Sequence, residues 1–359
     1  MVIIRILFIL SLLVGSVLGQ GSVTSRFEII QFYQGYQTPF VNGLHLTESG
    51  HNPAFPAKSG LEIAADWRYW SGIDSASWHP TELKRERLHL PQFLRIALGF
   101  GNFSFQAGYS QQFNSRIIFY YDRDDEENPL LKIILANYFG GLAYGRQIGT
   151  YRLQAGLGLI WYYYLYFNTF EDSETKVDAG GLAGRLGLLV ESPLLQISFF
   201  YDGGMRLSKE VQSPITWYGS ELILDYRQTI PHRYVLDALF FISPELSLNI
   251  GITSFDFSRQ NYRKLYERYY QTNRPHWRSS LAYQWNDRLQ TSLGMMAEIY
   301  TVKAYLVDAS TRYYLIGGIG FTLPYADVFL NIGDSHLFTD EIFRDYYIQM
   351  GFRLHGFFK

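Results

Sequence analysis

The chain of 359 residues contains no cysteine, so it can form neither a disulfide bond nor a lipid-modified N-terminal cysteine. A small exported domain held together by disulfides is therefore excluded. Charge is nearly balanced, with 31 basic and 33 acidic residues and a formal net charge of −2. This balance lacks the basic excess typical of nucleic-acid-binding proteins, so no nucleic-acid partner is expected. Beyond the N-terminus, no segment approaches the run of about 20 apolar residues that a membrane-spanning helix needs.

The N-terminal sequence MVIIRILFILSLLVGSVLGQ has the three-part layout of a secretory signal peptide. A positive charge at Arg5 precedes a mostly apolar run from Ile6 to Val14, and small residues lead to a cleavage site after Gly19. A single membrane-spanning helix is the alternative, for which this apolar run is short. We therefore predict a signal peptide at 1–19 and export of the rest of the chain.

Aromatic residues are abundant instead, at 18% of the chain with 29 Tyr and 27 Phe, alongside 32 Gly. An exported, aromatic-rich chain without long apolar runs is either a soluble β protein or an outer-membrane β-barrel. Apolar residues recur at every second position in many segments, as in LEIAADWRYW (61–70), FLRIALGF (93–100) and YYIQMGFRL (346–354). Side chains of a strand alternate between its two faces, so each segment predicts a strand with one apolar and one polar face.

The links between these segments alternate strictly between short and long. The short links lie at Gly101-Asn102, Gly149-Thr150, Glu191-Ser192-Pro193, Ser243-Pro244-Glu245, Asn286-Asp287-Arg288 and Leu323-Pro324-Tyr325. The longer, more polar links lie at about 72–91, 113–130, 170–177, 207–217, 258–276, 301–310 and 333–344. Bacterial barrels have short periplasmic turns and longer external loops, whereas a Greek-key sandwich has no reason for this order. The pattern predicts an all-β, antiparallel transmembrane barrel of about 14 strands in the bacterial outer membrane, with both termini in the periplasm.

One segment, 218–242, is longer than the roughly 9–11 residues that a strand needs to cross a bilayer. Its apolar residues nevertheless stay on even positions throughout, so we count it as one strand that projects above the membrane and is kinked at Pro231. Counting it as two strands is the alternative. Aromatic residues also predict the two interfacial girdles, namely Tyr162, Tyr163, Tyr164 and Tyr166 at one end and Phe357 and Phe358 at the other.

Residues 20–60 precede the first strand and are rich in turn-forming residues, so we predict an N-terminal periplasmic plug segment ahead of a barrel at 61–359. A barrel of this size leaves a lumen wide enough to need an obstruction. Within the segment, HNPAF (51–55) followed by LEIAADWRYWSGI (61–73) resembles the N-terminal region of FadL-like fatty-acid transporters. Asn52, Pro53 and Ala54 match the shared motif. IPHRYVLDALFFISPELSLNIGI (230–252) also resembles a FadL-type unit of proline, strand, turn and strand.

A second resemblance competes with the first. The stretch from Gln31 to Ile73 is similar to the PorV and PorP/SprF proteins of type IX secretion, through Asn52-Pro53-Ala54 and a W-x-G element at Trp70 and Gly72. The FadL resemblance implies uptake of a hydrophobic small molecule through a plugged lumen, with sideways exit through the wall. The PorV and PorP/SprF resemblance implies a membrane component of a secretion or surface-assembly system, with secretion-system proteins as partners.

Several charged residues alternate along their strands with the outward-facing apolar residues, so we assign them to the lumen. Candidate ligand-binding residues are Arg68, Arg95, Arg152, Arg185 and Arg353, which could bind the carboxylate of a fatty acid. Alternatively, these charges pair with acidic residues across strands or with the plug, as in any polar barrel interior. No spacing of histidine, serine and acidic residues indicates a catalytic, metal or cofactor site. The chain is therefore expected to be no enzyme and to need no cofactor or metal, and its partners are expected to be outer-membrane lipid, lipopolysaccharide and a hydrophobic ligand.

Overall fold

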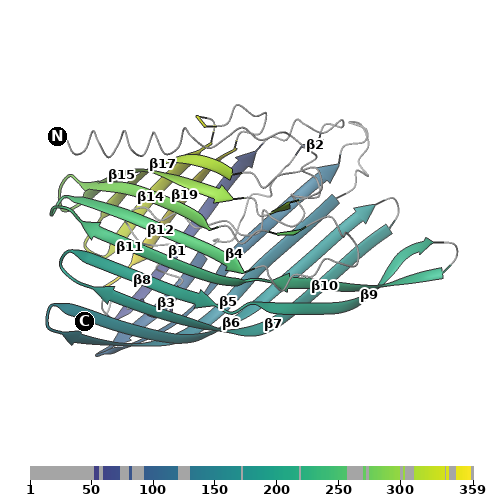
Figure 1. Ribbon diagram of the computed structural model, residues 1–359, viewed down its shortest axis with the longest axis horizontal. Coiled ribbons are helices and arrows are strands. Elements are labelled where there is room, and N and C mark those ends of the chain that lie inside the picture. The colour runs from purple at the N-terminus through teal and green to yellow at the C-terminus, as the bar shows by residue number, and fades with distance from the viewer. Residues whose placement is uncertain are drawn as a thin grey trace.

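The computed structural model describes residues 52–55, 60–72, 81–82, 93–119, 130–170, 173–217, 220–256, 270–271, 275–299, 302–303, 311–335, 337–338 and 345–356. These residues form a closed antiparallel β-barrel with 14 strands in its wall, as the alternation predicted (Figure 1). No helix in the described part of the chain is long and apolar enough to cross a bilayer. The predicted signal peptide at 1–19 and most of the predicted plug segment at 20–60 lie outside the described residues.

The wall strands are β1 (Leu61–Gly72), β3 (Phe93–Phe100), β4 (Phe103–Phe119), β5 (Leu130–Ile148), β6 (Tyr151–Phe170), β7 (Ser173–Glu191), β8 (Leu195–Asp202), β11 (His232–Phe241), β12 (Leu246–Asp256), β14 (His276–Gln284), β15 (Leu289–Ile299), β17 (Thr311–Thr322), β18 (Ala326–Asp334) and β19 (Asp345–Leu354). The remaining strands are β2 (Thr81–Glu82), β9 (Met205–Trp217), β10 (Ser220–Ile230), β13 (Tyr270–Gln271) and β16 (Val302–Lys303). Each wall strand pairs with its two neighbours, and β19 pairs with β1 from Ile63–Leu354 to Gly72–Asp345. Closure satisfies the backbone groups of a sheet in hydrocarbon, where water cannot.

All six predicted short turns lie at one end of the barrel, which is called the turn end below (Figure 1). Gly101 and Gly149 occupy the left-handed region there, each with φ of +59°, which explains glycine at two tight turns. β1 begins and β19 ends at the turn end, because Leu354 pairs with Ala326 beside the turn at 323–325. The opposite end, called the loop end, is formed by the far ends of long strands such as β5, β6 and β7.

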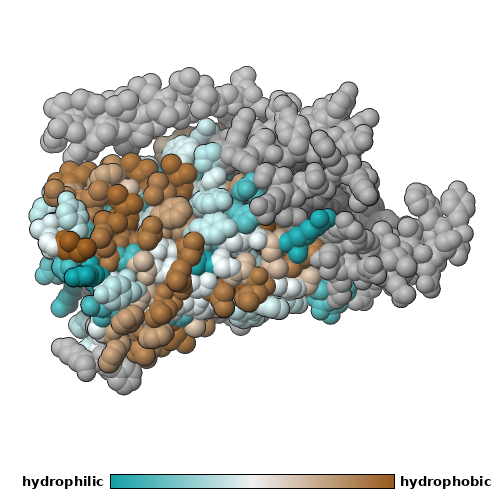
Figure 2. Space-filling view, turned by 60° about the horizontal axis from the view of Figure 1, so that its bottom comes forward, coloured by the Kyte–Doolittle hydropathy of each residue, from teal (hydrophilic) through white to brown (hydrophobic). Residues whose placement is uncertain are grey.

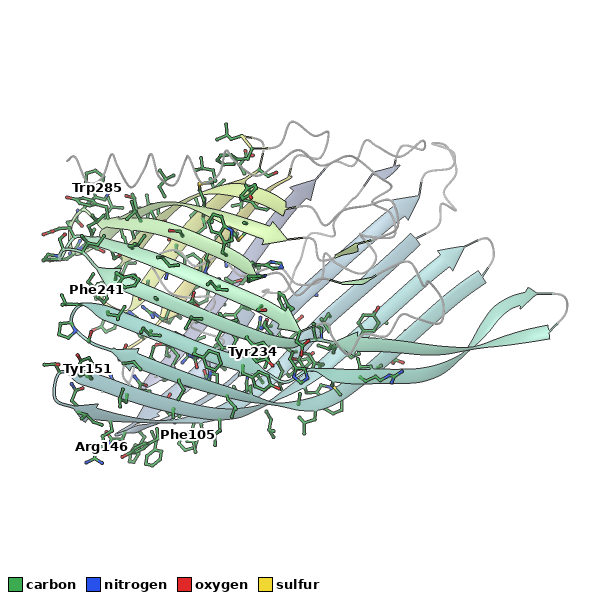
Figure 3. All side chains as sticks on the ribbon, in the orientation of Figure 1. Phe105, Arg146, Tyr151, Tyr234, Phe241 and Trp285 are labelled. Carbon is green, nitrogen blue, oxygen red and sulfur yellow. The ribbon has the colours of Figure 1, made fainter. Side chains whose placement is uncertain are left out.

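The two faces of the wall differ in polarity as predicted. Outward-facing Phe105 and Leu157 are 53% and 66% exposed, whereas inward-facing Gln106 and Gln154 are 6% and 4% exposed. Apolar side chains therefore cover the outer surface near the turn end (Figure 2). Exposed aromatic residues line this end, several of them labelled in Figure 3: Phe100, Phe103, Tyr144, Tyr151, Phe241, Tyr283, Trp285, Phe321 and Tyr325. They form one of the two aromatic girdles of a membrane barrel.

The girdle predicted from consecutive tyrosines is wrong in part. Tyr162 and Tyr164 are buried on the inner face, at 1% and 6% exposure, because parity along β6 turns every second residue inward. Tyr163, between them, is half-buried on the other face. The side chain of Tyr166, and all of Phe357 and Phe358, lie outside the described residues.

Two strands extend the barrel beyond its wall. β9 and β10 pair with each other and form a ribbon that projects past the loop end (Figure 1). Residues 207–217, predicted as a polar link, therefore belong to strand β9, and the predicted link at 170–177 shrinks to the step between β6 and β7. The segment 218–242, counted as one strand kinked at Pro231, instead contains two strands that are separated at Pro231, and only β11 belongs to the wall, so the segment crosses the wall once.

The ribbon interrupts the ladder of the wall. β7 pairs with β8 only from Glu191–Gln196 to Arg185–Asp202, and β8 then gives way to Gly203, Gly204 and β9. At the end of this ladder the Gly203 N–H donates to the Gly184 carbonyl oxygen at 2.8 Å. Beyond it, among the described strands, β9 pairs with β10 alone, while the Met205 and Leu207 side chains of β9 lie against Gly181 of β7. The backbone ladder of the wall therefore ends at Gly184, and side-chain packing joins β7 to β9 beyond it.

Candidate functional site

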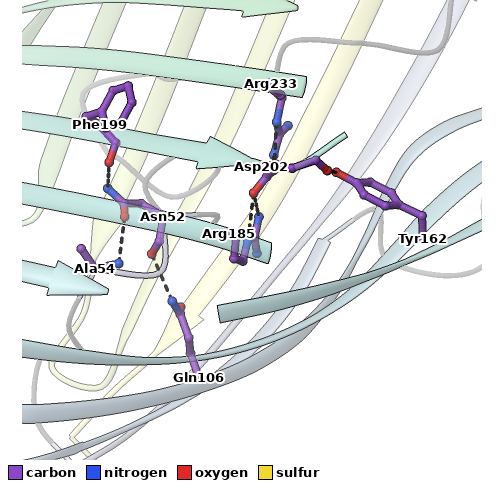
Figure 4. Close-up of polar contacts among 9 residues, drawn as sticks. Asn52, Ala54, Gln106, Tyr162, Arg185, Phe199, Asp202 and Arg233 are labelled. Atoms are coloured by element: carbon purple, nitrogen blue, oxygen red, sulfur yellow. Dashed lines mark hydrogen bonds and ion pairs between the residues drawn. The ribbon is translucent and has the colours of Figure 1, made fainter. Parts of the chain in front are cut away.

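A short turn of the N-terminal segment is seated inside the barrel. Asn52 is fully buried, and its side-chain Nδ2 donates to Ser198 Oγ at 2.8 Å and to the carbonyl oxygen of Leu188 at 3.1 Å. It also donates to the carbonyl oxygen of Phe199 at 3.2 Å (Figure 4). Asn52 Oδ1 accepts from the backbone N–H of Ala54 at 2.8 Å, which closes a side-chain turn around Pro53. The motif Asn52-Pro53-Ala54, called the plug turn below, is thus held against β7 and β8.

Glycines in the wall make room for the plug turn. A Cβ atom added to Gly187 on β7 would lie 1.9 Å from Asn52 Oδ1, and one added to Gly156 on β6 would lie 2.3 Å from the carbonyl group of Pro53. Real Cβ atoms do not approach other heavy atoms this closely. Glycine at 156 and 187 is therefore required for the plug turn to reach the wall backbone.

Polar side chains of two further strands hold the same turn. Gln106 Nε2 on β4 donates to the carbonyl oxygen of Asn52 at 3.1 Å (Figure 4). Arg95 on β3 donates through Nη2 to the carbonyl oxygen of Phe55 at 2.9 Å, through Nε to Gln106 at 2.8 Å and through Nη1 to Glu62 at 3.0 Å. Arg95 thereby links the end of the plug turn to three wall strands.

Closer to the loop end of the lumen, one aspartate forms ion pairs with two arginines. Asp202 on β8 is fully buried, and its Oδ1 accepts from Arg185 Nε and Nη2 at 2.9 and 2.8 Å (Figure 4). Its Oδ2 accepts from Arg233 Nε and Nη2 at 3.1 and 2.5 Å. Tyr162 donates its hydroxyl to the carbonyl oxygen of Gly203 at 3.2 Å. This network, called the Asp202 cluster below, lies at the point where the ladder between β7 and β8 ends.

Two more ion pairs lie on the inner face. Arg278 on β14 pairs with Asp237 on β11, and Arg353 on β19 pairs with Asp327 on β18 at 2.5 Å. Charges buried in a barrel interior must be paired or hydrogen-bonded, because isolated burial of a charge is costly.

The five arginines predicted to bind ligand differ in position and in partners. Arg95, Arg185 and Arg353 are buried on the inner face, but each is engaged with a carboxylate of the wall. Arg152 is exposed beside the turn at Gly149, so it lies at the barrel rim. The Arg68 backbone pairs with Gln349 in the wall, and its side chain lies outside the described residues. The structure thus brings three of the five into the interior without arranging them as an open row of cations.

Apolar residues also face the lumen. One buried cluster comprises Ala64, Phe93 and Phe139, with the two rings stacked at 6.1 Å between centroids. The Arg185 guanidinium lies over the Phe139 ring at 4.8 Å. A second cluster lies on β15 and β17: Met296, Tyr314 and Ile316. These clusters place two apolar patches on an inner face that otherwise carries many buried polar and charged side chains.

Sequence reasoning missed several of these residues. Asp202 and Arg233 were not nominated, although both have the inward parity of their strands, because the pairing across strands is invisible in one sequence. Met296, Tyr314 and Ile316 were missed because apolar residues occupy both faces of their strands, which blurs the alternation. No group of three or more metal-ligating side chains occurs among the described residues.

The fold is similar to solved hydrophobic-compound channels. The toluene transporter TbuX of Ralstonia pickettii matches with a TM-score of 0.56 at 10% identity, covering 91% of this chain and 97% of that one. A FadL homologue of Pseudomonas aeruginosa matches at 0.56 and 12% identity, over 89% and 99%. The CymD monoaromatic hydrocarbon channel matches at 0.52 and 11% identity, over 92% and 99%. No protein-family model and no curated protein matches the sequence. The predicted likeness to FadL-like barrels is thereby confirmed at the level of the fold, and the likeness to PorV and PorP/SprF stays a prediction.

Proposed function

We propose that this protein is a plugged outer-membrane channel for the uptake of hydrophobic small molecules. The observation that supports it most directly is the plug turn bonded to the inner wall, on a barrel whose inner face also carries two buried apolar patches. A passive porin instead has an open, water-filled interior. The solved barrels of similar fold include a toluene transporter and a monoaromatic hydrocarbon channel, so a ligand of about that size is the natural candidate.

The route follows from the polarity of the two ends. Short turns mark the periplasmic end of a bacterial barrel, so the loop end faces outward and the ligand enters there. The plug turn, held by β3, β4, β7 and β8, obstructs the direct path toward the turn end. We assign the sideways path into the membrane to the boundary between β7 and β9, where no backbone ladder joins the described strands. Sideways exit spares an apolar molecule the transfer into water, which is unfavourable in proportion to its apolar surface.

Uptake measurements distinguish this function from that of a porin. The full chain would be expressed in a Gram-negative host that lacks its own hydrophobic-compound channels, and uptake of radiolabelled ethylbenzene would be compared with uptake of a disaccharide. We expect faster entry of ethylbenzene than in cells with empty vector, and no change for the sugar. The variant Met296→Glu, which places a charge in the second apolar cluster, should lose the ethylbenzene uptake. Equal permeability to the sugar would contradict the proposal and indicate a passive pore.

The secretion-component alternative makes a different prediction. Such a barrel would co-purify with other envelope proteins after gentle solubilisation, whereas a channel for small molecules needs no such partner. The similar solved structures named above are channels and transporters, which is compatible with a barrel without enzymatic activity.

A further inference from the structure

Two inner-face polar side chains near the Phe93–Phe139 stack have unused hydrogen-bonding groups. Arg185 is 1% exposed and Asn137 is fully buried. Among the described residues, Arg185 Nη1 and both amide atoms of Asn137 meet no hydrogen-bond partner. Native proteins rarely bury such groups unpaired, because each one loses its hydrogen bonds to water without gaining others. The unpaired groups of Arg185 and Asn137 therefore point to a ligand that forms hydrogen bonds with them.

The geometry of Arg185 leaves one direction free. Its Nε and one hydrogen of its Nη2 donate to Asp202 Oδ1 at 2.9 and 2.8 Å, whereas Nη1 donates to no described residue. Gly158 on β6 has no side chain, and a Cβ there would lie 3.0 Å from Arg185 Cγ, so Arg185 lies close over the wall. The guanidinium reaches the Phe139 ring at 4.8 Å. The free donor is thus held beside an aromatic surface.

Asn137 faces the same region from β5. It lies two residues before Phe139 on the same inner face, and it pairs across the ladder with Tyr162 on β6. The hydroxyl of Tyr162 is turned to the carbonyl oxygen of Gly203, at 3.2 Å. The Asn137 amide offers two donor hydrogens on Nδ2 and an acceptor on Oδ1.

We propose that Asn137 and Arg185 form a polar subsite for the hydroxyl group of a phenol, whose ring lies against the Phe93–Phe139 stack. This inference rests on the proposed channel function and names the class of ligand. A phenolic hydroxyl accepts hydrogen bonds and donates one, so it can accept from Arg185 Nη1 or Asn137 Nδ2 while donating to Asn137 Oδ1. A pure hydrocarbon leaves all three groups unpaired. A carboxylate has no hydrogen to donate, so it leaves Asn137 Oδ1 without a partner.

Binding to matched ligands tests the assignment. The full chain in lipid nanodiscs would be equilibrated with 4-ethylphenol, ethylbenzene or 4-ethylbenzoate, and empty nanodiscs would correct for partitioning into lipid. The variant Asn137→Leu keeps a side chain of similar size and breaks no hydrogen bond of the described residues. Asn249→Leu is the matched control, since Asn249 is a 2% exposed inner-face residue on β12 whose amide atoms also meet no partner among the described residues.

We expect Asn137→Leu to weaken 4-ethylphenol binding about tenfold, the value of one hydrogen bond to a neutral ligand. Ethylbenzene binding should stay the same, and Asn249→Leu should change neither ligand. The inference is overturned if Asn137→Leu affects both ligands alike, if it behaves as Asn249→Leu does, or if 4-ethylbenzoate is the ligand that depends on Asn137. Ethylbenzene binding without this phenol effect refutes the subsite and leaves the channel function standing. Absence of binding by all three ligands refutes both.

Discussion

Asn52 Nδ2 donates to Ser198 Oγ at 2.8 Å, and this bond joins residues 146 positions apart in the chain. The same nitrogen reaches the carbonyl oxygens of Leu188 and Phe199, which face each other across the ladder of β7 and β8. A single amide thus binds a side chain and the backbone of two wall strands. The plug turn is therefore docked to the barrel by specific polar contacts as well as by its shape.

Replacing the donor should release the plug turn. In Asn52→Asp a carboxylate oxygen would face the carbonyl oxygens of Leu188 and Phe199 and repel them, and the loss should exceed that in Asn52→Ala. The chain has no cysteine, so Ala54→Cys provides a unique reporter at a fully buried position. Maleimide labelling of the Cys at 54 should be slow alone and faster when combined with Asn52→Asp. Equal labelling in both backgrounds would show that Asn52 does not hold the turn.

The close packing of the plug turn on Gly187 leads to an independent prediction. In Gly187→Ala the new methyl group would overlap Asn52 Oδ1 at 1.9 Å, so the turn must move and the Ala54→Cys reporter should label faster. Gly184→Ala on the same strand is the control, because a Cβ there meets nothing within 4 Å. If the two alanine variants label at the same rate, the steric argument for glycine at 187 is wrong.

Much of this fold is readable from alternation alone, because a barrel wall has lipid on one side and a polar lumen on the other. Leu157 and Gln154 on β6 show the expected contrast. The kink at Pro231 and the six short turns were predictable from turn chemistry. Pairing between strands was not, since Arg185 and Asp202 meet only through the register of β7 and β8. The inward position of Tyr162 was not predicted either, because a run of tyrosines shows no alternation of apolar and polar residues.

The Asp202 cluster predicts a large loss of stability from one substitution. Asp202→Leu removes the carboxylate shared by Arg185 and Arg233 and should destabilise the barrel by about 3–5 kcal/mol, as for other broken buried ion pairs. The triple variant Asp202→Leu, Arg185→Met and Arg233→Met removes all three charges and should recover much of that loss. Urea unfolding of the protein in lipid vesicles measures both. A triple variant less stable than Asp202→Leu would contradict the assignment of the loss to unpaired charge.

A charge placed on either face of β6 tests which face meets lipid. Leu157 is 66% exposed on the outer face, whereas Gln154 is buried on the inner face with its Nε2 at 3.2 Å from Glu191 Oε2. Leu157→Arg should lower the free energy of unfolding in vesicles by about 2–4 kcal/mol, the range for arginine near the bilayer midplane. Gln154→Arg should cost less, because Glu191 can pair with the new cation. The two substitutions introduce the same side chain three residues apart, so strand propensity cannot explain a difference between them. A larger loss for Gln154→Arg would mean that the outer face of β6 does not lie in hydrocarbon, and the transmembrane assignment of the barrel would fail.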